Sequence, residues 1–364
     1  MIKKFAPFFS LTPSMAKTLM RIEAAKQAIN DLPITITVLA KLRESARLSS
    51  VHYSTQIEGN RLTQDEVADV ILRKKATLRP RDEGEVKGYY QALQALEQYV
   101  AQEKPITEQR IKKLHALVMG NGLTTLQATP YRTGQNVIKD GSTGRIVYLP
   151  PQASDVPELM KALVLWIQEN NDLPCPLVAG IAHYQFATIH PYYDGNGRTA
   201  RLLTTFILHL GGYDLKGVYC LEEYYAKNLS AYYDAISTGP SHNYYEGREE
   251  ADITDWLKYF CDGMAQACEK VKQQAAKAAQ QQEPDQSRLL RKLNPKQRKV
   301  LELFKKSEEI TSQEICALFG FKPRTVSALC RTWVEKGFLV ISDPSRKGRK
   351  YQLAPAFSML VYGE

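Results

Sequence analysis

A twelve-residue stretch in the second half of the chain gathers residue types that handle phosphate groups. It reads His190-Pro191-Tyr192-Tyr193-Asp194-Gly195-Asn196-Gly197-Arg198-Thr199-Ala200-Arg201. Glycines let a backbone adopt positive φ and turn successive N–H groups toward one point. Apolar residues then recur at helical spacing, so a helix should begin here, and its N-terminus adds unpaired N–H groups and a positive dipole end. The stretch therefore predicts an anion-binding turn at a helix start.

Four side chains add chemistry to this turn. Arg198 and Arg201 are three residues apart and share a helix face, so they could grip two parts of one polyphosphate. Asp194 offers a hard oxygen ligand suited to Mg²⁺. His190 can be neutral at working pH and accept a proton from an attacking hydroxyl. The set predicts phosphoryl or nucleotidyl transfer; the alternative is a tight turn with solvated arginines and a structural histidine.

The stretch resembles the signature of the Fic family, His-Pro-Phe-x-Asp-Gly-Asn-Gly-Arg-x-x-Arg, with Tyr192 in place of Phe. The resemblance implies a mainly α fold, with a Fic-type helical core and a β-hairpin flap. It also implies a protein adenylyltransferase that moves AMP from ATP-Mg to a Ser, Thr or Tyr hydroxyl of a target protein or of itself. His190 would be the general base and Asp194 the Mg²⁺ ligand, while Arg198 and Arg201 would bind the β- and γ-phosphates.

Further nucleotide contacts follow from the same resemblance. The anion hole would be formed by Gly195, Asn196 and Gly197, and the ATP-binding set extends through Thr199 and Ala200. Tyr232 and Tyr233 lie on a helix after the signature, and similar tyrosine pairs in the family line the nucleotide pocket near the adenine or ribose. Aromatic residues at helical positions also serve as core, and this alternative stays open.

A hairpin is expected over residues 131–149, where two short β-prone runs flank a turn rich in Gly and Asp. In the Fic family such a hairpin is a flap over the active site that holds the target segment by strand addition. The candidate docking edge is Ile146, Val147, Tyr148 and Leu149. The alternative is a packed surface hairpin.

Residues 54–60, Ser-Thr-Gln-Ile-Glu-Gly-Asn, resemble the inhibitory motif of the family, Ser/Thr-x-x-x-Glu-Gly/Asn. The inhibitory residues would be Ser54, Glu58 and Gly59. In the family this glutamate pairs with the second motif arginine, here Arg201, and keeps ATP from binding productively. The alternative is a solvated glutamate ending a helix, although a negative charge there opposes the helix dipole.

The C-terminal part carries the basic excess of the chain. The net charge is +9, and residues 288–350 alone contain 16 Lys and Arg against 6 Asp and Glu. Three helical segments near 295–306, 312–319 and 323–336 precede two strand-like runs, 338–342 and 350–353, a pattern that resembles a winged helix-turn-helix. If it binds DNA rather than protein, the contacts would come from Arg324, Thr325, Ser327, Arg331, Arg346, Lys347 and Arg349.

The helical periodicity gives the domain organisation. We expect an N-terminal helical region with the inhibitory helix (1–105), a Fic core (106–265), a helical linker (266–290) and a winged helix-turn-helix domain (291–364). A capping box at 63–66 should open one helix. The other helices outside the C-terminal part are expected at 14–30, 35–57, 83–101, 107–119, 155–170, 177–189, 197–210, 222–237 and 252–282.

The composition speaks against a membrane-spanning or a secreted protein. No apolar run approaches the roughly 20 residues of a membrane span, and prolines interrupt the start of the chain where a secretory signal would lie. The six cysteines lack metal-binding spacing, so free thiols and a cytoplasmic location are expected. A homodimer is left open.

Two other functions remain at this point. The same site could remove AMP, with Glu58 positioning water. The chain could also be a DNA-binding regulator whose Fic core only senses nucleotides, although the presence of His190 speaks against a core without catalysis.

Overall fold

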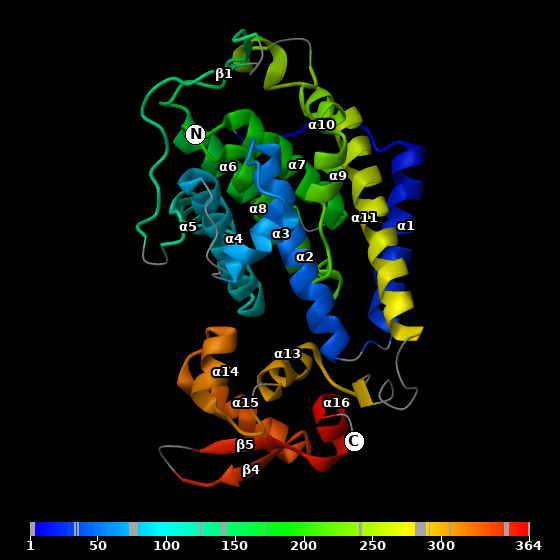
Figure 1. Cartoon of the computed structure of the whole chain (residues 1–364). Helices are drawn as coiled ribbons and strands as arrows, with labels where there is room; N and C mark the ends of the chain where they lie inside the picture. Colours follow the sequence, from blue (N-terminus) through cyan, green and yellow to red (C-terminus); the bar gives the residue numbers. More distant parts are fainter. Residues whose placement is uncertain are drawn as a thin grey trace.

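The centre of the molecule is a pair of packed helices, α7 (Cys175–Ile189) and α8 (Asn196–Leu210), joined by the loop that follows His190 (Figure 1). α7 is buried around nearly its whole circumference, as expected of a helix that is apolar on all sides. The computed structural model describes residues 4–32, 34, 36–72, 79–123, 126–139, 143–170, 172–239, 242–280, 289–290, 292–305, 307–345 and 349–362. The candidate phosphate turn thus lies between two core helices that hold both of its ends.

Further helices surround this pair. α4 packs against α8 and α5, α6 packs against α7, and α2 packs against α4 and α8. Thr63 caps the short helix α3 with the reciprocal capping box expected from the sequence. Their bounds are α2 (Ile36–Ile57), α3 (Gln64–Ile71), α4 (Pro80–Ala101), α5 (Glu108–Met119) and α6 (Val156–Glu169).

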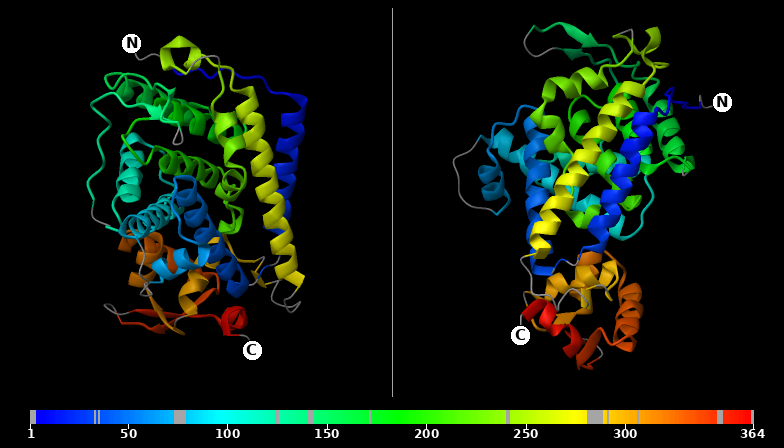
Figure 2. Two further views of the ribbon diagram at one scale, coloured as in Figure 1. Left: turned by 45° about the horizontal axis from the view of Figure 1, so that its top comes forward. Right: turned by 90° about the vertical axis from the view of Figure 1, so that its right-hand side faces the viewer.

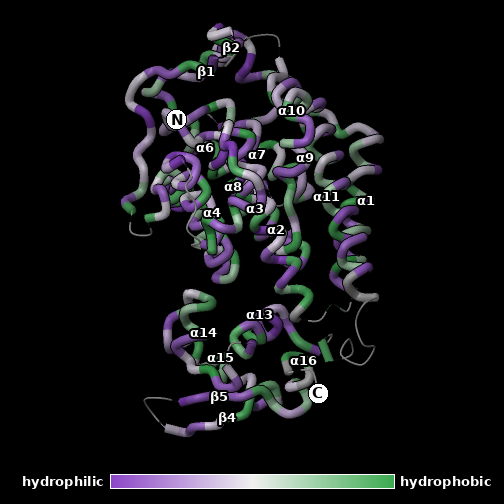
Figure 3. Tube along the Cα trace, in the orientation of Figure 1, coloured by the Kyte–Doolittle hydropathy of each residue, from purple (hydrophilic) through white to green (hydrophobic). Residues whose placement is uncertain are grey.

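Helix α1 (Pro13–Asp31) runs alongside α11 (Thr254–Gln280), so the two ends of the helical body are joined (Figures 1 and 2). Hydrophobic and hydrophilic residues alternate along both helices (Figure 3), and the apolar side of each faces the core. Thr18 donates a hydrogen bond of 3.1 Å to the carboxylate of Asp262 at this contact.

This packing corrects the expected domain boundaries. Cys268, Val271 and Ala275 are buried in the main core, so the first part of the expected linker belongs to the helical body. The same core contains residues on both sides of position 105, and no packing boundary separates the N-terminal helices from the Fic core among the described residues.

The expected helix at 222–237 is two helices, α9 (Glu222–Lys227) and α10 (Leu229–Ile236). Asn228 interrupts them because its side chain accepts a hydrogen bond from the N–H of Ala231 and so caps α10. A short 3₁₀ turn, η1 (Leu215–Gly217), precedes them, and a turn of π-helix, η2 (Tyr244–Arg248), follows.

Two strands form the expected hairpin, β1 (Ile138–Lys139) and β2 (Ile146–Tyr148), which pair antiparallel. Residues 140–142 of the expected turn lie outside the described residues. The hairpin lies at the edge of the helical body that is turned away from the C-terminal unit (Figure 1), and Tyr148 ties it to the end of α7.

The C-terminal unit has its own hydrophobic core and lies beyond the lower ends of α2 and α4 (Figure 1). Its strands form an antiparallel sheet in the order β3-β5-β4. Strand β3 and helix α16 were not expected from the sequence. The elements are α13 (Pro295–Phe304), β3 (Ile310–Thr311), α14 (Ser312–Phe319), α15 (Pro323–Glu335), β4 (Leu339–Asp343), β5 (Lys350–Leu353) and α16 (Pro355–Tyr362).

None of the helices in the described part of the chain combines the length and apolar character that crossing a membrane requires. All six cysteines are free thiols, as expected.

Candidate active site

His190 ends α7 in the left-handed conformation, with φ 51° and ψ 60°. Its ring Nδ1 lies 3.4 Å from the carbonyl oxygen of Ala187. Because a carbonyl oxygen only accepts, this contact places the proton on Nδ1 and leaves Nε2 as the basic nitrogen. Burial lowers the pKa of His190 to about 4, so the imidazole is neutral at neutral pH and able to accept a proton.

The first turn of α8 holds a carboxylate from a distant helix. A Cβ placed on Gly197 would lie only 2.2 Å from Oε1 of Glu58, so only a glycine permits this approach. The first N–H groups of a helix have no partner within it, and together with the dipole they attract an anion. Glu58, which follows the last residue of α2, therefore lies where a phosphate group would bind.

Arg201 is the second partner of Glu58. Its Nη2 donates to Oε1 of Glu58 and to the carbonyl of Ser54, and its Nε donates to the hydroxyl of Ser54, each at 2.8 Å. Burial by itself lowers the pKa of Arg201, but the combined effect of Glu58, Tyr232 and Tyr89 outweighs burial and raises the pKa. The structure thus contains the contact of Glu58 with Arg201 that the family resemblance implied, and adds Ser54 as a further partner of Arg201.

One nitrogen of Arg201 is left over. Nη1 is buried and has no hydrogen-bond partner among the described residues. It lies 3.2 Å from the position of a Cβ on Gly197, at the start of α8. A buried donor without an acceptor is costly, so an oxygen-rich anion such as a phosphate fits this place.

Arg198 lies between two carboxylates. Its Nη2 is 3.3 Å from Oδ1 of Asp194, and its Nη1 is 3.8 Å from Oε1 of Glu85. The side chain is buried, and its Nε has no partner within the described ranges. Both motif arginines thus lie beside carboxylates and retain unpaired donors.

Asp194 has an exposed carboxylate beside the anion turn, with 65% of the side-chain surface accessible. Its Oδ1 accepts a hydrogen bond of 2.6 Å from the N–H of Gly195. Nowhere in the described ranges do three or more potential metal ligands gather. A divalent ion at Asp194 would therefore depend on oxygens of a bound nucleotide, which is the coordination that Mg²⁺ prefers.

Two residues expected to contact ATP, Asn196 and Thr199, instead hold the loop with their side chains, and a third, Ala200, is buried. Oδ1 of Asn196 accepts a hydrogen bond of 2.9 Å from the N–H of Tyr192, and Nδ2 of Asn196 donates one of 2.8 Å to the carbonyl of Tyr192. These two bonds close the turn. Thr199 donates to the carbonyl of Gly195 at 2.8 Å, and Ala200 is fully buried. Thr199 also donates its own N–H to the carbonyl of Gly195 at 3.0 Å, so neither its hydroxyl nor its N–H is left for a nucleotide.

Sequence reasoning missed two residues that fix this loop. Arg132 is buried and donates from Nε to the carbonyl of His190 at 3.0 Å, while its own N–H bonds to the carbonyl of Pro191 at 2.9 Å. His115 stacks on Tyr192 with ring centroids 3.6 Å apart, and its Nε2 lies 2.8 Å from the carbonyl oxygen of Asp194. The two come from segments 58 and 79 residues away from their partners, so no local pattern could have revealed them.

A third missed contact ties the inhibitory segment to Arg198. Asn60 is buried, and its Nδ2 donates at 3.0 Å both to the carbonyl of Asp82 and to Oε2 of Glu85. Glu85 is the same carboxylate that faces Arg198. The chain just after Glu58 is therefore anchored to α4.

Tyr232 and Tyr233 lie in different surroundings, one in the core and one partly exposed. Tyr232 is buried, and its hydroxyl is 3.0 Å from Nε2 of His183, within the aromatic core. Tyr233 is 46% exposed, and its hydroxyl donates to the carbonyl of Ile57, next to Glu58. Tyr233 is therefore the one of the two with a surface that a nucleotide could meet.

The expected docking edge is shorter than the sequence indicated. Tyr148 is buried and donates to the carbonyl of Thr188 at 2.9 Å, and both backbone groups of Leu149 bond to the segment at 242–244. Ile146 and Val147 are 57% and 40% exposed. The edge available to a target segment therefore narrows to these two residues.

In the C-terminal unit the candidate DNA-contacting residues on α15 lie together on its exposed side, while Val326, Cys330 and Trp333 face the core. The exposed residues are Arg324, Thr325, Ser327, Arg331 and, in front of β5, Arg349. Arg346 and Lys347 lie outside the described residues.

Comparison with known proteins finds similarity in the part of the chain that contains this site. Residues 105–208 match the model of the Fic/DOC family. The protein adenylyltransferase Fic of Drosophila grimshawi is 27% identical over 201 residues, which are 54% of this chain and 40% of that protein. Its namesake in Nematostella vectensis is 28% identical over 198 residues, or 53% of this chain and 44% of the relative. The chain thus spans less than half the length of these relatives.

Solved structures share the fold. A Fic family protein from Desulfovibrio desulfuricans superposes with a TM-score of 0.61 at 22% identity, covering 96% of this chain and 99% of that one. Fic-1 of C. elegans, residues 134–508, superposes with a TM-score of 0.57 at 23% identity and covers 73% of each chain. The architecture is therefore that of Fic proteins.

Proposed function

We propose that this chain is a protein adenylyltransferase, which moves AMP from ATP to a hydroxyl group of a target protein. One observation carries the proposal: the carboxylate of Glu58 lies against Gly197 at the start of α8 and bonds to Arg201. A helix start, two buried arginines and a neutral imidazole are the groups that nucleotidyl transfer requires. The relatives that match about half of this chain are named protein adenylyltransferases.

In the proposed reaction the hydroxyl oxygen of the target bonds to the α-phosphorus of ATP, and the bond from this phosphorus to the pyrophosphate breaks. His190 takes the hydroxyl proton on Nε2, the nitrogen that its contact with Ala187 leaves free. The N–H groups at the start of α8 and the guanidinium of Arg198 stabilise the charge that develops on the leaving pyrophosphate. Asp194 would hold Mg²⁺, which neutralises phosphate charge when bound.

Glu58 is the proposed brake on this reaction. Its carboxylate lies beside Gly197 at the start of α8 and pairs with Arg201, the place and the arginine that a terminal phosphate of ATP would require. ATP therefore binds productively only when Glu58 moves away, and its α-phosphorus is otherwise not aligned with the attacking hydroxyl. Ile146 and Val147 would hold the target segment by strand addition, and the chain itself is one such target.

Incorporation of labelled ATP by wild type, Glu58→Gly and His190→Ala tests the proposal. We expect slow incorporation by wild type, faster incorporation by Glu58→Gly and none by His190→Ala. Mass spectrometry of the products should show an adduct of AMP. Release of AMP from a modified protein without any transfer would instead favour hydrolytic removal of AMP, with Glu58 positioning water.

A second activity is proposed for the C-terminal unit, as a winged helix that binds DNA. The observation in its favour is the exposure of Arg324, Thr325, Ser327 and Arg331 along one side of α15. Mobility shift of duplex DNA should weaken steeply with salt, and Arg331→Ala should reduce both affinity and salt dependence. Absence of any shift at low salt would refute it and leave protein contacts as the role of this unit.

A further inference from the structure

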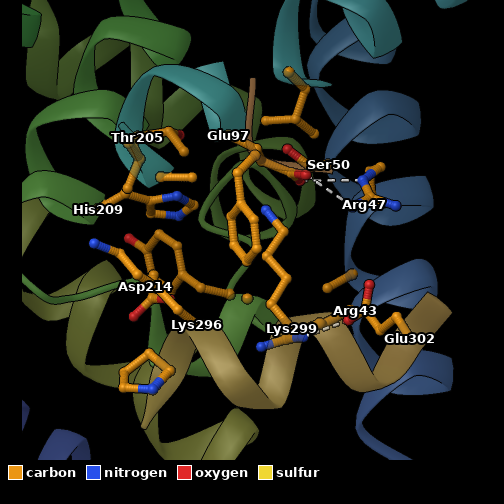
Figure 4. A pocket seen from close by; sticks show the side chains of 18 of the residues that line it. Arg43, Arg47, Ser50, Glu97, Thr205, His209, Asp214, Lys296, Lys299 and Glu302 are labelled. Carbon is orange, nitrogen blue, oxygen red and sulfur yellow. Dashed lines mark hydrogen bonds and ion pairs between the residues drawn. The ribbon is translucent and has the colours of Figure 1, made fainter. Parts of the chain in front are cut away.

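A cavity of about 310 Å³ lies where the C-terminal unit meets the helical body. It is lined by residues of α2, α4 and α8 on one side, and by α13 and Phe319 of α14 on the other (Figure 4). This volume is at the small end of the range for ligand sites in proteins. None of the residues placed above in the nucleotide site lines it.

Lys299 of α13 extends into this space (Figure 4). Its amino group makes no hydrogen bond or ion pair with any residue in the described part of the chain, and it lies 5.7 Å from the centre of the Phe319 ring. Burial lowers the pKa of Lys299, and the opposing effect of Glu97 and Glu302 does not cancel this. The charge of Lys299 therefore lacks a close partner.

The carboxylates nearest to Lys299 are engaged with arginines. Glu97 accepts two hydrogen bonds from Arg47, at 2.9 and 3.1 Å. Glu302 accepts one from Arg43 at 2.6 Å. These pairs form the wall of the cavity and leave Lys299 unmatched (Figure 4).

Two further cations near α13, Lys216 and Arg298, do not line the cavity. Burial, followed by repulsion from Arg298 and Arg43, lowers the pKa of Lys216 to about 8. Burial and Arg43 also lower the pKa of Arg298. The cavity itself is lined by four cations, Arg43, Arg47, Lys296 and Lys299, and by five carboxylates, Glu97, Glu103, Asp214, Glu222 and Glu302. Three of these cations are paired with carboxylates and Lys299 is not, so the attraction for a negatively charged occupant comes from Lys299.

The remaining wall is largely apolar and aromatic, with Leu93, Val100, Tyr219, Pro295 and Phe319. We propose that this cavity binds a small organic carboxylate, whose charged group meets Lys299 and whose apolar body lies against Phe319 and Tyr219. Asp214 lies beside His209 (Figure 4) and would exclude a second negative group at that end.

The position of the cavity makes its occupant an effector rather than a substrate. Ser50 on α2 is one helical turn from Ser54, and Thr205 on α8 is one turn from Arg201. Thr205 also donates a hydrogen bond of 3.0 Å to the carbonyl of Arg201. A ligand here touches the C-terminal unit and both helices that meet at the inhibitory contact.

Calorimetric titration of the full chain with 3-phenylpropionate and with its uncharged amide tests the proposal. Wild type should bind the carboxylate more tightly than the amide by about tenfold. Lys299→Met, which keeps the length of the side chain without its charge, should lose this preference, as should Lys299→Gln. Lys296→Met is the matched control, because Lys296 lines the same cavity but lies 3.6 Å from Glu103; it should keep the preference.

Equal binding of the two probes by wild type would overturn the proposal. So would an unchanged preference in a folded Lys299 variant, or no heat from the carboxylate up to about 10 mM, a concentration at which even a weak site binds. Neither readout involves AMP transfer, so failure here leaves the proposed enzymatic function untouched.

Discussion

Replacement of Glu58 by glycine separates the inhibitory contact from the rest of the site. The Glu58 and Arg201 charges are 2.8 Å apart, with side-chain exposures of 27% and 1%. At an effective dielectric constant of about 20 their gross attraction is roughly 6 kcal/mol. The net value is smaller, because Arg201 regains a partner when a phosphate replaces Glu58, and a hydrogen bond to a charged group is worth about 1.5–3 kcal/mol net.

ATP must overcome this net amount in wild type but not in Glu58→Gly. Each 1.4 kcal/mol corresponds to a factor of ten, so self-modification at low ATP should rise by roughly 10- to 100-fold. The assay is the initial rate of labelled AMP incorporation at an ATP concentration below KM. ATP should also raise the melting temperature of the variant more than that of wild type, because it restores a partner to the buried Arg201.

Glu44→Gly is the matched control for this experiment. Glu44 lies on the same helix α2 and also pairs with an arginine, Arg47 at 2.7 Å, but far from the nucleotide site. It should leave the rate near the wild-type value. A folded Glu58→Gly within twofold of wild type, or equal activation by Glu44→Gly, would refute the reasoning.

Three further outcomes are expected. Tyr192→Phe should stabilise the fold by about 1 kcal/mol in chemical denaturation, because the Tyr192 hydroxyl is buried without a partner in the described structure; a destabilised variant would contradict this. Asn60→Ala should activate incorporation to a level between wild type and Glu58→Gly, because the anchor of the inhibitory segment to α4 is lost; a wild-type rate would show that the anchor is not needed. By NMR, His190 should titrate with a midpoint of about 4. Because an unfolded histidine titrates near 6.5, the free energy of unfolding should fall as the pH drops from about 6.5 to about 4. A midpoint of about 6.5 would contradict a buried, neutral His190.

The turn, the helix start and the cap could be predicted from the sequence because each depends on residues that are neighbours in the chain. Glycines at 195 and 197 indicate the turn, the apolar spacing after 198 indicates the helix, and Thr63 with Glu66 predicts a cap that the structure contains. Ser54 lies in the last turn of α2 and Glu58 directly follows this helix, and the family resemblance supplied Arg201 as the partner of Glu58.

The missed features depend on contacts between distant segments. Arg132 and His115 support the loop after His190 from elements that only the fold brings near. The docking edge was overestimated because nothing near Leu149 in sequence shows that residues 242–244 occupy its backbone groups. The cavity around Lys299 likewise exists only because α13 docks beside α2 and α8.

The extent of the hydrophobic core also depends on contacts between distant segments. The Gln- and Ala-rich end of α11 reads as a linker by composition, yet Val271 and Ala275 are buried there. The partner that buries this end is α1, more than 200 residues earlier in the chain. Periodicity predicts that such a helix has an apolar face but does not name what covers it.

The central claim is that Glu58 and a terminal phosphate of ATP compete for one position. A crystal structure of the Glu58→Gly, His190→Ala chain with ATP and Mg²⁺ tests it most directly. We predict a γ-phosphate oxygen beside Gly197 and within hydrogen-bond distance of Nη1 of Arg201, the donor that is unpaired now. A triphosphate bound away from the start of α8, with Arg201 still bonded only to Ser54, would contradict the account.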